Sequence, residues 1–296
     1  MNSKKSCALI MIGASLWGGI GVFFNMLSDV GFTQMQVVAI RVAAAAIALT
    51  LYLLVTDRSK LRVKLRDCWC FVGTGIVSLV FFNWCYFTAI QMTSLAVAAV
   101  LLYTSPIFVM LFSAVLFHES LTPRKLVALA VTFVGCVFVA GVFGGENAYS
   151  PLGIFIGICS GVGYALYSIF GRFALEKGYS SVTISEYTFL FATISAVPLS
   201  RIWEAAPLLA QGQTLIGALG IGVLCCVFPF ILYTQGLSGV ETGKAAILAT
   251  MEPAVAAVLS FLLYHESLLN LKGVGILLIF ASVAMLNQPA KQKDAS

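Results

Sequence analysis

Glu252 is an acidic residue in the middle of a long apolar run, and Pro253 follows it directly. An ionised carboxylate buried among apolar side chains costs several kcal/mol unless it is paired or solvated. One hypothesis is that Glu252 faces a cavity, where it binds a cationic substrate group or carries a coupling proton. The other is that it bonds backbone groups freed by the proline, or pairs permanently with Arg41.

Arg41 is the one cation of the sequence inside an apolar run. Its planar guanidinium could receive the carboxylate of a substrate through two parallel hydrogen bonds. Alternatively, its long side chain extends to a polar boundary, or it ties its helix to a neighbour. The sequence leaves these roles open.

Aromatic and amide side chains recur at similar positions in the apolar runs and could give a cavity apolar walls with a few hydrogen-bonding groups. The set is Trp17, Asn83, Trp84, Tyr86, Gln91, Tyr103, Tyr164, Tyr167 and Tyr233. The alternative is that these aromatics pack between helices or anchor helix ends. An internal repeat, described below, favours the pairs Trp17 with Tyr164 and Tyr86 with Tyr233.

Pro106 and Pro253 lie deep in apolar runs. Each proline removes an amide donor and frees the carbonyl four residues earlier, at Leu102 and Ala249, which predicts a kink. The bend either shapes a cavity and serves as a pivot, or is a packing kink whose freed groups are satisfied by neighbouring helices.

Common catalytic and metal-binding patterns are missing from the sequence. There is no P-loop, no Gly-x-Ser-x-Gly and no His-Glu-x-x-His. The eight cysteines fall in or beside apolar runs without the spacing of a metal site, which favours packing roles. We therefore expect no metal, no cofactor and no enzymatic activity.

The composition predicts an all-α, polytopic membrane protein. Of 296 residues, 60% are hydrophobic and only 10% are charged, whereas a soluble domain is about 25% charged. Each bilayer span needs about 20 apolar residues. Breaks at charges and prolines give ten spans, namely 7–28, 34–55, 68–90, 93–117, 123–143, 151–174, 183–203, 214–236, 241–264 and 271–288.

Lysine and arginine predict the orientation of these spans. With the N-terminus in the cytoplasm, fourteen basic residues lie in inside segments and two, Arg201 and Lys272, lie outside. Such a bias is typical of cytoplasmic loops. We therefore predict a protein of the cell membrane with both termini on the cytoplasmic side. The net charge of +5 is explained in this way and indicates no nucleic-acid partner.

The sequence repeats itself at an offset of 147 residues. Residues 106–121 and 253–268 share seven identities in sixteen, including the proline and all of "HESL". The chain is thus predicted to hold two five-helix halves, 1–143 and 151–288, followed by a cytoplasmic tail, 289–296. Because five is odd, the second half is inverted in the membrane, a design that is common in transporters.

This inversion separates His118-Glu119 from His265-Glu266, since each pair falls on its own side of the membrane. The pairs therefore cannot form one catalytic or metal site. We expect each to end its helix at the interface, with Glu119 able to pair with Arg124 or Lys125. Thr122-Pro123 is typical of a helix start.

The duplicated Pro-x12-Glu-Ser-Leu helix and the opening "SLWGGIGVFF" resemble the EamA domains of the drug/metabolite transporter superfamily. The resemblance covers 7–288. It implies ten helices around a central cavity, with the fifth and tenth as scaffold, and transport of small metabolites, often export of amino acids or related compounds.

The sequence as a whole predicts a secondary transporter that moves a small metabolite by alternating access, with proton coupling through Glu252 left open. Ten spans in one chain are compatible with a working monomer. The alternative is an intramembrane enzyme or a small-molecule receptor. An enzyme would need two convergent reactive groups on one side of the bilayer, and the sequence offers one acid without a base near it.

Overall fold

The computed structural model describes residues 2–142, 150–264 and 271–287, which contain helices and no strands. The helices are α1 (Ser3–Gly18), α2 (Ile20–Val30), α3 (Gln34–Thr56), α4 (Cys68–Val72), α5 (Phe81–Met92), α6 (Leu95–Leu102), α7 (Ser105–Leu116), α8 (Pro123–Ala140), α9 (Pro151–Glu176), α10 (Ser181–Ser200), α11 (Ala206–Leu209), α12 (Gly212–Leu219), α13 (Phe228–Leu237), α14 (Thr242–Ala249), α15 (Met251–Tyr264) and α16 (Leu271–Asn287). Short 3-10 turns span Arg58–Leu61, Leu65–Asp67 and Ile202–Ala205.

The helical runs confirm a polytopic α-helical membrane protein. Within the described residues, nine runs are long and apolar enough to cross a bilayer, and Leu271–Leu286 is a shorter apolar helix. The nine are Ser3–Val30, Gln34–Thr56, Leu65–Met92, Leu95–Leu116, Pro123–Ala140, Pro151–Glu176, Ser181–Ser200, Gly212–Leu237 and Thr242–Tyr264. Several of these runs are interrupted, so that a single membrane span then consists of two successive helices.

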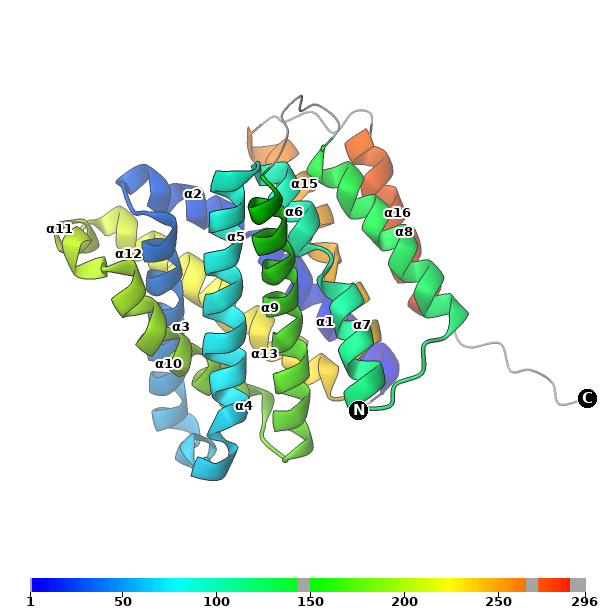
Figure 1. The fold of residues 1–296 in the computed structure, drawn as a ribbon. Helices are drawn as coiled ribbons and strands as arrows, with labels where there is room; N and C mark the ends of the chain where they lie inside the picture. The colour runs from blue at the N-terminus through cyan, green and yellow to red at the C-terminus, as the bar shows by residue number, and fades with distance from the viewer. Residues whose placement is uncertain (1, 143–149, 265–270, 288–296) are drawn as a thin grey trace, which may run out of the picture.

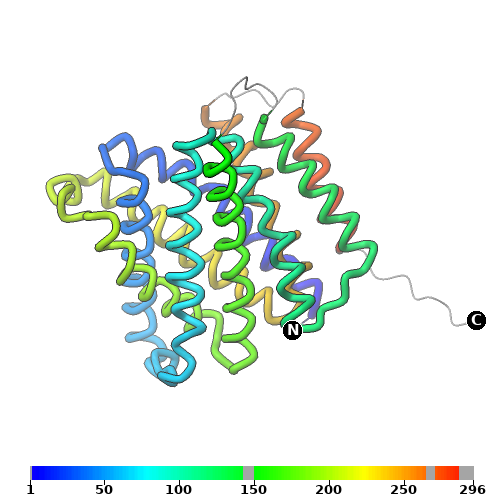
Figure 2. The backbone as a smooth tube through the Cα atoms, in the orientation of Figure 1, coloured from blue at the N-terminus to red at the C-terminus, as the bar shows by residue number. Residues whose placement is uncertain are grey.

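The helices form one bundle in which α1 packs on α13, α14 and α15 (Figures 1 and 2). At one edge α8 lies along α16, and on the other side α3 lies along α10, with α11 and α12 beyond α3 in this view (Figure 1). We call the end of the bundle where α1 begins at Ser3 the N-terminal face, and the end where that span finishes at Val30 the opposite face.

Irregular helix geometry recurs at the offset of the sequence repeat. Gly73–Val80 and Gly220–Val227 are both π-helical and begin 147 residues apart. The fourth span breaks after Leu102, and Thr242–Tyr264 breaks after Ala249, again 147 residues later. The first span also breaks at Gly19, which the sequence did not predict.

The edge pair α8 and α16 is held by close contacts that do not involve the bundle interior. Thr132 and Ser282 share a hydrogen bond of 2.6 Å between their hydroxyls, and a side chain on Gly275 would meet the Gly135 carbonyl at 2.6 Å. Thr122 accepts from the Lys125 amide at 3.4 Å, with Pro123 in the first turn, which confirms the predicted start of this helix.

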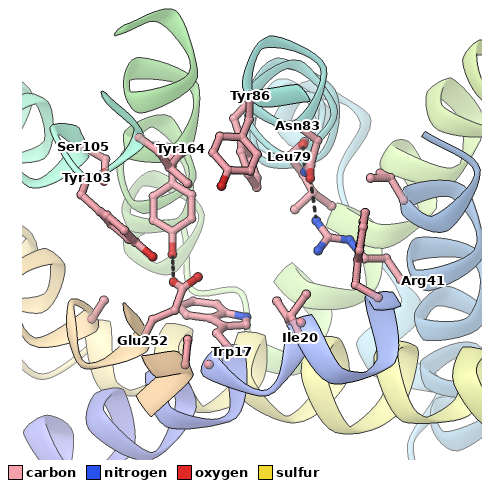
Figure 3. A pocket seen from close by; sticks show the side chains of 18 of the residues that line it. Trp17, Ile20, Arg41, Leu79, Asn83, Tyr86, Tyr103, Ser105, Tyr164 and Glu252 are labelled. Carbon is pink, nitrogen blue, oxygen red and sulfur yellow. Dashed lines mark hydrogen bonds between the residues drawn. The ribbon is translucent and has the colours of Figure 1, made fainter. Parts of the chain in front are cut away.

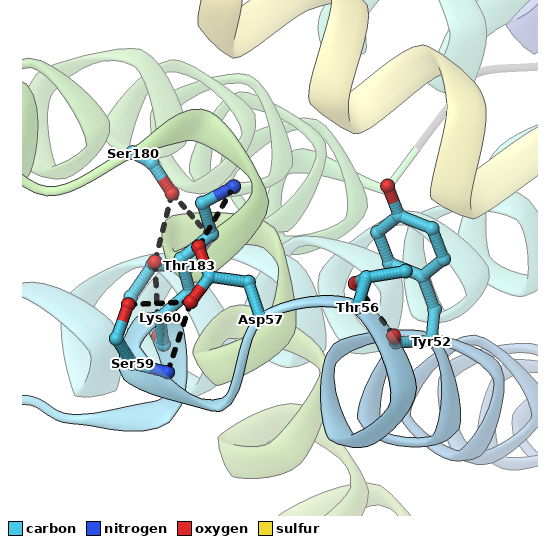
Figure 4. Close-up of polar contacts among 7 residues, drawn as sticks. All are labelled: Tyr52, Thr56, Asp57, Ser59, Lys60, Ser180 and Thr183. Atoms are coloured by element: carbon cyan, nitrogen blue, oxygen red, sulfur yellow. Dashed lines mark hydrogen bonds and ion pairs between the residues drawn. The ribbon is translucent and has the colours of Figure 1, made fainter.

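The connection between α3 and α4 is fixed to the start of α10 on the N-terminal face (Figure 4). Asp57 accepts hydrogen bonds from the amide and hydroxyl of Ser59 at 3.1 and 2.5 Å and lies 3.4 Å from the Lys60 ammonium. The Thr183 hydroxyl donates to the Lys60 carbonyl at 3.0 Å. The bond from Ser59 to Asp57 holds the pKa of this carboxyl below its usual value.

Parts of the sequence predictions fall outside the described residues. These are His265-Glu266 with the rest of the second "HESL", and the tail 289–296.

Glycines spaced by four let α9 approach α5 and α6 closely, as the sequence predicts for such a face. A Cβ on Gly153 would meet the Met92 side chain at 2.7 Å, and one on Gly161 would meet the Leu101 carbonyl at 2.7 Å. Gly171 on the same helix is different, since the nearest atom to its Cβ lies at 3.9 Å.

We predict that Gly161→Ala destabilises the fold, because the Leu101 backbone cannot move aside cheaply. Overpacking of this kind costs about 1–3 kcal/mol, so the thermal midpoint of the purified protein in detergent should fall. Gly171→Ala is the matched control on α9 and should leave the midpoint unchanged or raise it. Equal midpoints for the two variants would contradict the close packing.

A candidate binding cavity inside the bundle

A cavity of about 530 Å³ lies between the helices of the bundle. Its walls come from α1 and α2, α3, the π-helical stretch with α5, α6 and α7, α9, α13, and α14 with α15. The edge helices α8 and α16 contribute no lining residue within the described chain. The volume falls in the range of small-molecule sites.

One wall of the cavity carries Glu252, at the start of α15 just after the break (Figure 3). The Tyr164 hydroxyl donates to its Oε2 at 2.9 Å. Tyr103 lies on the same side of the cavity (Figure 3). The carboxylate thus has a partner within the cavity wall and is not paired with Arg41.

The facing wall carries Arg41 from α3 (Figure 3). Its Nη2 donates to the side-chain oxygen of Asn83 at 3.2 Å, and Asn83 in turn donates to the Leu79 carbonyl at 2.6 Å. The buried Nε of Arg41 has no hydrogen-bond partner among the described residues. Arg41 lines the cavity, and its guanidinium carries further N–H donors beside the one given to Asn83.

The floor of the cavity is aromatic. Trp17 contacts Phe230 edge-on at 5.2 Å and Tyr233 at 5.4 Å between ring centroids. The Tyr233 hydroxyl is hydrogen bonded to Ser168 at 2.7 Å, and Tyr167 is hydrogen bonded to Thr234 at 2.6 Å. These bonds join α9 to α13 and satisfy the hydroxyls that the floor buries.

The structure brings eight of the cavity residues expected from the sequence together in one lining. They are Trp17, Arg41, Asn83, Tyr86, Tyr103, Tyr164, Tyr233 and Glu252. Ser105, which the repeat aligns with Glu252, also lines the cavity. Two other predicted side chains, Trp84 and Gln91 of α5, are exposed and do not line the cavity.

Several polar lining residues were not predicted from the sequence, among them Ser78, Ser168 and Gln34. A usable signal existed in helix periodicity. Ser168 lies four residues after Tyr164, and Gln34 lies seven before Arg41, so each shares a helix face with a residue already chosen. Taking whole helix faces would have found both.

Each predicted proline lies in the first turn after a helix break. Tyr103 follows the end of α6, and α7 begins at Ser105 with Pro106 in its first turn; Thr250 likewise follows the end of α14, shortly before Pro253. At each break a threonine hydroxyl bonds a carbonyl three residues earlier, Thr104 to Leu101 and Thr250 to Ile247, both at 2.6 Å. Glu252 and Tyr103 reach the cavity at these breaks.

The cavity reaches the opposite face and stops short of the N-terminal face. Its lining includes Asn25, Leu95 and Tyr264, which lie near span ends on the opposite face. Toward the other end the lining stops at residues such as Val109 and Ala246, one to two turns inside their spans.

Polar contacts cover the closed end. The Glu119 carboxylate accepts from the amides of Thr242 and Gly243 at 2.5 and 3.0 Å. The sequence predicted that Glu119 could pair with Arg124 or Lys125, and this was wrong. Lys125 pairs with Glu241 at 2.6 Å, and Arg124 donates to the Met285 carbonyl, because the start of α14 offers Glu119 two amide donors.

The family model for EamA-like transporters matches the chain twice, at residues 4–141 and 151–288. The chain belongs to the EamA-like transporter family. An uncharacterised transporter of Archaeoglobus fulgidus is 28% identical over 93% of this chain and 94% of the relative. The threonine/homoserine exporter RhtA of Salmonella typhimurium is 27% identical over 70% of this chain and 66% of the exporter.

A solved crystal structure supports the fold. It covers 96% of this chain and 96% of its own, with a TM-score of 0.79 and 17% sequence identity. At this identity the likeness extends to the fold alone. This EamA-like chain is therefore a multi-pass membrane protein with transporter relatives and an internal cavity.

We predict that Ser260→Cys reacts with a small hydrophilic thiol reagent several-fold faster than Ser113→Cys. Ser260 lines the cavity and is partly exposed, whereas Ser113 is 1% exposed beyond its closed end, and thiol reactivity follows access. Peptide mass spectrometry separates these sites from the native cysteines. Equal reactivity would contradict a cavity closed at the N-terminal face.

Proposed function

We propose that this EamA-like protein is a secondary transporter that moves a small metabolite across the cytoplasmic membrane by alternating access. The observation that carries the proposal is a cavity within a transporter-family bundle, with Glu252 on one wall and Arg41 on the facing wall (Figure 3). A bound solute could bridge these charges while the aromatic floor packs against its apolar part.

The substrate class that fits best is an amino acid or a related amphipathic compound. Its ammonium group would be received by Glu252, beside the Tyr164 hydroxyl, and its carboxylate by the guanidinium of Arg41 on the facing wall. The name of the relative RhtA, a threonine/homoserine exporter, supports this class and an outward direction.

Alternating access in this proposal uses two five-helix halves, 1–143 and 151–288, inverted with respect to each other in a ten-helix chain. The recurrence of the π-helical stretches and helix breaks at one offset of 147 residues supports the repeat. Inverted repeats provide two related states, one open to each side of the membrane.

The orientation in the proposal follows from the basic residues. The N-terminal face would be cytoplasmic, with both termini and the tail 289–296 on that side, and the cavity would open outward in this structure. The partners would be the solute, the lipid bilayer and, in a coupled cycle, protons carried by Glu252. A single chain encloses the cavity, which supports a working monomer.

We predict that Glu252→Gln abolishes or strongly reduces counterflow of labelled amino acids in proteoliposomes. The amide keeps the size of the carboxylate but cannot balance an ammonium group. If Glu252 also carries protons, stimulation of flux by a pH gradient should disappear in this variant. Glu204→Gln is the control, since Glu204 is an exposed acid paired with Arg201 at 3.7 Å.

Unchanged flux and unchanged pH dependence in Glu252→Gln would contradict the role of this residue. Saturable binding of a solute without any counterflow would contradict transport itself and favour a receptor. Product formation from the solute would favour an intramembrane enzyme.

We predict that Arg41→Gln raises the half-saturating concentration of an amino acid about tenfold or more. The reason is that hydrogen bonds to charged groups contribute about 1.5–3 kcal/mol. The effect should be much smaller for the corresponding amino-acid amide, which has no carboxylate. The measurement is competition by the two compounds against labelled substrate. An equal loss for both compounds would contradict recognition of the carboxylate by Arg41.

A further inference from the structure

The start of α14 receives its cap from the other half of the chain. Glu119, just after α7, accepts hydrogen bonds from the amides of Thr242 and Gly243 at 2.5 and 3.0 Å. The residue that precedes α14, Glu241, makes no side-chain cap of its own. The first amides of a helix need acceptors and favour a negative charge.

The same place holds a second contact between the halves. The Lys125 ammonium lies 2.6 Å from the Glu241 carboxylate and 2.7 Å from the Ser120 carbonyl, and the Lys125 residue is 7% exposed. Glu241 is thus drawn toward Lys125, which leaves the α14 amides to Glu119. Two charged side chains of the first half therefore hold one helix start of the second.

This helix start lies where the cavity is closed. Helix α7 packs along α14, and Val109, Ala165 and Ala246 form a small buried cluster at the end of the cavity. Beyond it, toward the N-terminal face, a Cβ on Gly243 would meet Met110 at 3.0 Å and the Glu119 carboxylate at 3.7 Å. Separating α7 from α14 would open this end.

The other end of the cavity has a different arrangement. Leu95 and Leu102 of α6 line the cavity, as do Leu259 and Tyr264 of α15. The main packing partners of α15 within the described chain are α1, α8 and α16, rather than α6. At the repeat offset of 147 residues, α7 corresponds to α15 and α14 corresponds to α6. The α7–α14 pair is therefore in contact at one end, whereas the equivalent α15–α6 pair is apart at the other.

We propose that Glu119 is a latch that holds the gate between α7 and α14 shut while the cavity opens to the opposite face. The two hydrogen bonds from Thr242 and Gly243 exist only while α14 lies against the end of α7. Breaking them leaves the helix start uncapped, so they stabilise the closed gate relative to the open one. The importance of this gate for transport rests on the proposed function, but the closure is a property of the fold.

The test measures access to the closed end without any substrate. Ser113→Cys places a thiol on α7 beside Gly243, where Ser113 is 1% exposed. Its labelling by a hydrophilic maleimide in lipid nanodiscs is compared with and without Glu119→Ala, Glu119→Gln or Glu119→Asp. We expect the alanine and glutamine variants to raise the labelling rate roughly tenfold or more, since two charge-assisted bonds are lost. The aspartate variant should give a smaller rise.

A second variant removes a donor and keeps Glu119. Thr242→Pro has no amide to donate, and proline is well tolerated at the first position of a helix. The preceding Glu241 already has the extended backbone that proline requires, with φ −64° and ψ 144°. This variant should raise S113C labelling less than Glu119→Ala, because the Gly243 bond remains. It tests the same latch if the Glu119 variants do not fold.

Asp57→Asn is the matched control, because Asp57 is a carboxylate on the N-terminal face that caps only its own turn. Thermal midpoints establish that each variant is folded. Unchanged labelling in folded Glu119→Gln and Thr242→Pro proteins would overturn the proposal, as would an equal rise in Asp57→Asn. A protein that shows the expected labelling but no flux would contradict the proposed function and leave the latch supported.

Discussion

The requirement that backbone N–H and C=O groups be satisfied without water governs this structure. In a bilayer an unpaired backbone group costs several kcal/mol, so spans are helical and irregular backbone is tolerated only inside protein or beside a cavity. The breaks after Leu102 and Ala249 and at Gly19 obey this rule, since residues around each of them line the cavity. Threonine hydroxyls at two breaks bond nearby carbonyls.

The helix breaks after Leu102 and Ala249 also place polar side chains on the cavity wall. A straight helix through Tyr103 or Glu252 would present its side chains with uniform periodicity, whereas the break lets the second helix start anew beside the cavity. Glu252 then meets the Tyr164 hydroxyl, and Arg41 on the facing wall is supported by Asn83. Each charge is held by a neutral hydrogen-bonding partner rather than by the other charge, which leaves both able to bind a solute.

The asymmetry of the two ends follows from which helices meet. Equivalent pairs of helices in the repeat differ: α7 packs on α14 at one end, whereas their counterparts α15 and α6 are separated by the cavity at the other. Near the packed end, carboxylate-to-amide and ammonium-to-carboxylate contacts supplement a small apolar cluster. The open end depends on aromatic and apolar side chains, with Asn25 donating to the Tyr264 hydroxyl at 3.4 Å.

The sequence by itself determined the apolar helical segments, their approximate ends and part of the cavity lining, because apolar length and helix periodicity are local properties and a buried charge requires a cavity or a partner. Tertiary structure decided the partners. Glu252 lies beside Tyr164 and not Arg41, Trp84 faces outward, and Glu119 caps α14 instead of pairing with a nearby base. The two contacts join residues that are 88 and 123 positions apart in the chain. No local sequence pattern specifies which distant helices meet.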